Sequence, residues 1–144
     1  MANLDFYTQE LEKIQEDLMK RLDNVVIGLN RLSDQELIKI AQQIDIFDEM
    51  ERLGYSGLIA RVSNTYEDEI AIVFAELSEK ELGKIAAVSL TTLEQLKNFE
   101  LTHLTGSVRQ YADQLKAAML RELITGESPE SIMLNLRRGF GAGT

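Results

Sequence analysis

The most regular hydrophobic pattern in the chain is a heptad repeat over its first 32 residues. The residues that recur every seven positions are Leu4, Leu11, Leu18, Val25 and Leu32, with Tyr7, Ile14, Leu22 and Leu29 between them. Such a repeat is typical of a helix that packs along another helix. We therefore predict a helix over residues 3–32, about 45 Å long at 1.5 Å per residue. A globule of this size is only about 30 Å wide, so other long helices must lie against it, in this chain or in a neighbour.

The hydrophobic residues further along the chain also follow helical spacing. We predict helices over residues 34–53, 58–77, 79–88, 92–125 and 129–138, with a break in the hydroxyl-rich stretch 89–92. In the helix over 92–125, Leu96 and His103 fall on the predicted inner edge, and Gly106 is expected to kink or divide the helix. No segment alternates as a strand does. The predicted fold class is all-α, an elongated helical bundle with long, coiled-coil-like helices.

Several of these helix ends carry recognisable signals. Ser33 and Ser78 each precede a glutamate by three residues, which is the spacing of a capping box at a helix start. Gly54 and Gly126 follow helical segments, at the position where a glycine with left-handed backbone commonly ends a helix.

The chain divides near residue 126 into a main helical part, 1–126, and a C-terminal segment, 127–144. Ser128 is expected to cap a short helix that Pro129 begins, and residues 139–143 have the glycine-rich composition of a hinge. We expect this hinge to lead into a further C-terminal part. The short helix should dock on a partner or on the main bundle through apolar residues, with two arginines meeting acidic groups at the edge. These residues are Ile132, Met133, Leu136, Arg137 and Arg138.

Composition fits a helical protein with a core of ordinary size. Of the 144 residues, 44% are hydrophobic and one is proline. Cysteine is absent, which excludes disulfides and thiolate chemistry. No apolar run approaches the roughly 18 residues of a membrane span. The formal net charge is −9, so general nucleic-acid binding is not expected, although the two C-terminal arginines leave a local contact open.

Few residues could carry catalysis or bind a metal ion. Glu100 and His103 have the Glu-x-x-His spacing that helical bundles use for paired metal ions, but His103 is the only histidine. The acidic run 67–69 cannot converge on one ion, because adjacent residues of a helix point in different directions. Nucleophile elbows and phosphate-binding loops are absent from the sequence. We predict no catalytic, cofactor-binding or metal-binding site and a chain that is not an enzyme.

Residues 111–132 contain a characteristic series of helix breaks. A long helix ends at Gly126, Ser128-Pro129-Glu130 opens a short helix, and two arginines and a hinge follow. With these features residues 93–144 resemble the helical front portion of tailed-phage minor head proteins, the head-morphogenesis family that includes the F protein of phage Mu. The resemblance implies a low-copy component of a phage head, made in the host cytoplasm and placed near the portal vertex. It also implies a non-enzymatic role for this region, in head assembly or DNA delivery.

The leading expectation is a virion structural protein whose helices pack on portal or capsid proteins, or on further copies of the chain. The candidate partner-binding residues of the first helix are Leu11, Leu18 and Val25. Those of the short last helix are Ile132, Met133, Leu136, Arg137 and Arg138. A phage scaffolding protein or another coiled-coil adaptor would have the same composition and stays open as an alternative. A helical enzyme with a carboxylate metal site is the third possibility.

Overall fold

The structure, a computed structural model, describes the backbone of residues 4–76 and 79–142, and their side chains apart from positions 70 and 73–93. Its helices are α1 (Asp5–Leu29), α2 (Asp34–Ala41), α3 (Ile46–Met50), α4 (Ser56–Glu76), α5 (Glu79–Ile124) and α6 (Pro129–Phe140). A kinked segment, Glu51–Tyr55, with non-helical backbone at Gly54, joins α3 to α4. Residues 4–76 and 79–142 contain no strand, so the all-α prediction is confirmed.

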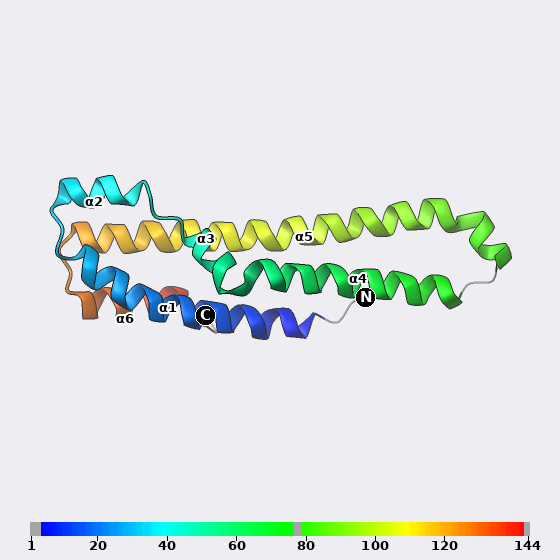
Figure 1. Cartoon of the computed structure of the whole chain (residues 1–144), viewed down its shortest axis with the longest axis horizontal. Helices are drawn as coiled ribbons and strands as arrows, with labels where there is room; N and C mark the ends of the chain where they lie inside the picture. The colour runs from blue at the N-terminus through cyan, green and yellow to red at the C-terminus, as the bar shows by residue number, and fades with distance from the viewer. Residues whose placement is uncertain (1–3, 77–78, 143–144) are drawn as a thin grey trace.

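The helix α5 is the axis of the molecule (Figure 1). Its 46 residues correspond to about 69 Å of helix, and its first turns bend away from the line of the rest (Figure 1). The helix α4 lies alongside one end of α5, and α1, α2, α3 and α6 surround the other end. The first turn of α1 reaches only partway along α4, so α4 and α5 continue beyond it as a pair. We call residues 63–76 and 79–103 the arm, and the remainder the bundle.

The hydrophobic core lies in the bundle, where α1, α5 and α6 meet. Its largest fully buried side chains are Tyr55, Leu18, Met50, Leu115, Met119, Ile132, Leu136, Val26 and Val62. Along α1 and α5 the buried residues recur every three or four positions, which keeps one face of each helix towards its neighbours. The side chains of α6 belong to this same core, so α6 is an integral part of the bundle.

The prediction of one helix over 34–53 is wrong, because the chain forms α2 and α3 with a turn between them. Ser33 caps α2 as predicted, since its hydroxyl accepts a hydrogen bond from the Glu36 amide at 3.3 Å. Asp45 caps α3 in the same way, accepting from the Asp48 amide at 2.9 Å. A short acidic side chain that competes for backbone amides starts a new helix even where the apolar spacing continues.

The bend between α3 and α4 depends on Gly54. Its φ of +123° is a conformation that side chains with a Cβ rarely adopt, and it confirms the predicted helix end. The next residue, Tyr55, is buried, and its hydroxyl lies 3.1 Å from the hydroxyl of Tyr7 on α1. The Tyr55 ring also meets the ring of Phe47 edge-on, with centroids 6.0 Å apart. This aromatic cluster ties α1 and α3 to the base of α4.

The long helix α5 contradicts two sequence predictions. The expected break at residues 89–92 does not occur, and Gly106 neither kinks nor divides the helix. A glycine within a helix costs only about 1 kcal/mol relative to alanine, and buried Val108 and partly buried Leu104 hold this stretch against the core. The cap predicted at Ser78 lies outside the described residues.

The C-terminal helix α6 begins as predicted and ends later than predicted. The Ser128 hydroxyl accepts from the Ser131 amide at 3.2 Å, and Pro129 is the first helical residue. The helix continues through Gly139 to Phe140, so the expected hinge starts too early. Phe140 is fastened to α5, because the Tyr111 hydroxyl donates to its carbonyl oxygen at 2.5 Å. Gly141 ends the helix where a Cβ would sit 2.5 Å from the Arg137 carbonyl oxygen.

The two contrasting glycines give a test of this fold. Gly54→Ala should lower the free energy of unfolding by about 1–3 kcal/mol, because alanine is strained at positive φ. Gly106→Ala should raise it by up to about 1 kcal/mol, since nothing lies within 4 Å of a Cβ added there. Urea denaturation of both variants measures the difference. A Gly106→Ala change as damaging as Gly54→Ala would mean that α5 is broken at Gly106.

Candidate protein-contact surfaces

The heptad residues of α1 that were expected to bind a partner lie in three different environments. Leu18 is 1% exposed in the chain's own core, Leu11 is partly buried against that core, and Val25 is 39% exposed. A straight helix turns by about 20° per heptad relative to a strict seven-residue repeat. The buried face therefore moves from Leu18 to Leu22 and Val26, and Val25 rotates outward.

The apolar residues of α6 are used within the chain. Ile132, Met133 and Leu136 are all less than 5% exposed, so the surface on which this helix docks is the main bundle. Arg137 meets an acidic group as expected, through an ion pair with Asp23 of α1. Arg138 is exposed at the end of the helix.

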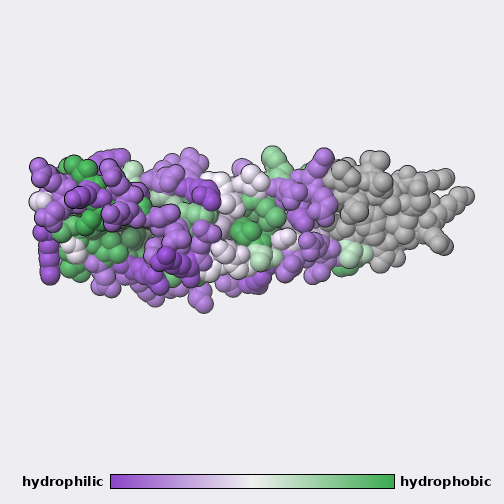
Figure 2. Space-filling view, turned by 45° about the horizontal axis from the view of Figure 1, so that its top comes forward, coloured by the Kyte–Doolittle hydropathy of each residue, from purple (hydrophilic) through white to green (hydrophobic). Residues whose placement is uncertain are grey.

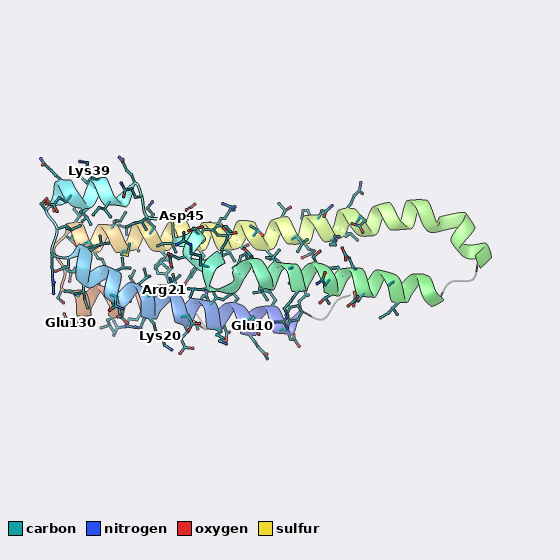
Figure 3. The ribbon with its side chains drawn as sticks, viewed as in Figure 1. Glu10, Lys20, Arg21, Lys39, Asp45 and Glu130 are labelled. Carbon is teal, nitrogen blue, oxygen red and sulfur yellow. The ribbon has the colours of Figure 1, made fainter. Side chains whose placement is uncertain are left out.

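One groove, with a volume of about 520 Å³, lies between α1 and the α2–α3 connection. Four of its five charged side chains pair with one another. Arg21 lies 2.6 Å from Glu49, and Arg52 lies 3.0 Å from Asp48. Figure 3 shows Arg21 on α1 and Asp45 near the start of α3, while Glu130 lies at the far end of the bundle. These pairs leave the groove with little net charge to attract an ionic ligand.

A second hollow, of about 320 Å³, lies between α2 and the C-terminal end of α5. Ile38 and Ile124 line it and are 56% and 51% exposed. Figure 2 shows hydrophobic side chains gathered at this end of the molecule, and another group midway along it. Leu134 of α6 is similarly exposed. The surface of the bundle thus carries separate apolar residues among many charged ones.

A largely covered lysine lies between the two helices of the arm. Lys97 of α5 is 8% exposed, and its ammonium group lies 3.2 Å from Glu67 of α4 and 3.1 Å from Glu94. Hydrogen bonds to these two carboxylates, Glu94 first, raise the pKa of Lys97, so it stays charged. A lysine can cover apolar surface with its methylene stem while its charge is paired at the edge. Lys97 therefore occupies the inner position of α5 that the sequence analysis assigned to Leu96.

The prediction that Leu96 and His103 lie on the inner edge of α5 is wrong. Leu96 is 53% exposed and His103 is exposed. Each residue of a helix is rotated by about 100° from the one before, so with Lys97 facing α4, Leu96 turns towards solvent. Phe99 is 68% exposed, and His103 stacks on its ring with centroids 6.3 Å apart. On α4, Ile72 is 59% exposed.

Sequence analysis missed this surface, which we call the apolar strip: Ile72, Leu96 and Phe99. Its only signal in the sequence is the spacing of Leu96, Phe99 and His103, which repeats at three and four residues. That spacing also describes an ordinary core face, so it could not reveal which side of the helix is uncovered. Glu100 lies one helical turn from Leu96, and Glu69 lies one helical turn from Ile72. Burial, then the charges of Glu100 and Glu69, raise the pKa of Tyr66 in the arm.

The titratable side chains inside the bundle have structural roles. Burial and the hydrogen bond to Tyr55 raise the pKa of Tyr7, so both hydroxyls of this pair stay protonated. Burial raises the pKa of Tyr111 to about 12, and its hydroxyl holds the end of α6. Within residues 4–76 and 79–142, no group of three or more His, Cys, Asp or Glu side chains could hold a metal ion.

Comparisons with known proteins give no relative for this chain. No family model matches it, and searches of curated proteins and of solved structures find no match. Among the described helices, none is both long enough and apolar enough to cross a membrane.

The two heptad residues Leu18 and Val25 test the placement of α1. Leu18→Ala should lower the free energy of unfolding by about 2–5 kcal/mol, the usual cost of a cavity in a core. Val25→Ala should change it by about 0.5 kcal/mol, because the side chain is at the surface. Urea denaturation of the isolated protein measures both. Equal losses of unfolding free energy would show that Val25 is buried like Leu18, and would contradict the outward rotation of Val25.

Proposed function

We propose that this chain is a non-enzymatic structural protein that works through helix-mediated contacts with other proteins. The observation that carries the proposal is the arm, a pair of long helices that leaves the bundle with large apolar side chains exposed. Exposed hydrophobic groups surrounded by polar ones commonly mark protein contacts. Fully burying a leucine or phenylalanine side chain gains roughly 1.5–3 kcal/mol, so covering the apolar strip would stabilise a complex considerably.

The attachment of the arm to the bundle suits a structural role. At its base, Arg61 of α4 lies over the ring of Phe6 and 3.4 Å from Glu10 of α1. Figure 3 shows Glu10 near the N-terminal end of α1, next to α4. On α5, Arg109 lies over the ring of Phe47, 4.1 Å from its centroid. These contacts hold the arm in one direction, so a partner bound to it would be kept at a fixed position relative to the bundle.

We further propose that the contacts are made in a tailed-phage head, near the portal vertex, in head assembly or DNA delivery. The support for this finer assignment is the resemblance of residues 93–144 to minor head proteins. A scaffolding protein is the alternative, since it too would act through helical contacts. The two differ in whether the protein stays in the finished particle.

Mass spectrometry of purified particles from the phage that encodes the chain tests this assignment. A minor head protein should be found at low copy number in both immature heads and mature virions. A scaffolding protein should be abundant in immature heads and lost from mature ones. Absence from both kinds of particle would overturn the proposal of a phage head component.

A further inference from the structure

We propose that the apolar strip is the binding site of a basic amphipathic helix from another protein, which lies end to end with α1 as the third helix of the arm. The inference rests on the proposed function in protein contacts and names the chemistry of the partner. It is carried by three observations: the strip lies on one side of the arm, this side continues the surface that α1 covers, and acidic groups flank it.

The ion pairs of Lys97 define the two sides of the arm. Glu67 and Glu94 both reach Lys97 and so lie on one side. At about 100° per residue, Leu96 is rotated by about 100° from Lys97 in the direction opposite to Glu94. Phe99 is rotated by about 160° from Lys97, and it therefore lies near the outer face of α5. On α4, Ile72 is rotated by about 140° from Glu67, also away from the ion pairs. Ile72 and Leu96 therefore share the side of the arm opposite the carboxylates that pair with Lys97, and Phe99 lies at the outer edge of that side.

The helix α1 covers this same side of α4 and α5 nearer the bundle. Its Glu10 and Phe6 contact Arg61, which by the same rotation lies on the Ile72 side of α4. Its Gln15 is within hydrogen-bonding reach of Tyr111 on α5. Beyond the first turn of α1 the described residues supply no third helix on this side (Figure 1). A helix added there would continue a packing arrangement that the chain already uses.

The acidic side chains near the apolar strip favour a basic partner. Glu69 precedes Ile72 by three residues and Glu100 follows Leu96 by four, and these spacings place side chains next to each other on one helix face. Asp68 lies on the strip side of α4 by its rotation. Arg61 is already paired with Glu10. Lysines or arginines flanking an apolar stripe would meet these carboxylates, whereas the arm of a second copy would bring like charges together.

The probe for this site is a helical peptide of about 18 residues, about 27 Å long, with leucine at every third or fourth position and lysine elsewhere. The full chain should bind it, and binding should weaken in about 0.5 M salt because screening reduces the attraction. Two control peptides separate the electrostatic contribution to binding from the hydrophobic one. The first has glutamate in place of lysine, and the second has serine in place of leucine. Neither should bind with comparable affinity.

Matched variants locate the site. Leu96→Ser with Phe99→Ser should weaken binding of the lysine–leucine peptide by about tenfold or more. Ile38→Ser with Leu134→Ser removes apolar residues of similar exposure from the bundle and should leave binding unchanged. Circular dichroism and urea denaturation show whether each variant keeps its fold. Since all four residues are exposed, both double variants should remain folded.

Three results would overturn the inference. The lysine–leucine peptide could fail to bind, or it could bind the serine variants of the strip as well as the unchanged chain. Alternatively, analytical ultracentrifugation could show a dimer that Leu96→Ser with Phe99→Ser abolishes, which would make a second copy the occupant. A chain that fails these tests yet is recovered in phage particles would keep its proposed function and lose only the basic-helix partner.

Discussion

The length of α5 is the constraint on which the rest of the structure depends. At 46 residues it is nearly twice as long as α1, which has 25, and none of the other helices in the described residues is long enough to accompany it from end to end. The chain therefore covers α5 in two different ways. Several helices enclose its C-terminal part in a core, and α4 alone runs along its N-terminal part. The bundle is the part of α5 that several helices enclose, and the arm is the part that only α4 accompanies.

The interactions in the two parts differ accordingly. In the bundle, buried leucines, methionines and isoleucines from α1, α5 and α6 supply most of the stability, and caps such as Ser128 define where helices begin. In the arm, the described contacts between α4 and α5 include the ion pair between the Lys97 ammonium group and Glu67. A pair of helices can bury only one side of each, so apolar residues on the remaining sides stay exposed to solvent. The apolar strip has this origin.

Sequence analysis succeeded where the determinant is local. Ser33, Gly54 and Ser128 each act on backbone groups within a few residues, so their roles could be predicted. It failed where the outcome depends on distant packing. Val25 continues the heptad but rotates out of the core. Lys97, rather than Leu96, lies on the inner face of α5, where it pairs with Glu67, a residue 30 positions earlier in the chain. The strip could not be predicted, since its exposure depends on where α1 ends relative to α4.

A distance measurement along α5 tests most directly whether a single helix joins the bundle to the arm. The chain has no cysteine, so cysteines introduced at the exposed positions Gln95 and Asp113 can carry spin labels for pulsed electron resonance. Eighteen residues of uninterrupted helix place the two backbones about 27 Å apart on the same side. We expect one narrow distance distribution consistent with that separation. A broad distribution, or a distinctly shorter distance, would show that α5 bends or divides near Gly106 and would contradict the architecture from which the arm and its strip are derived.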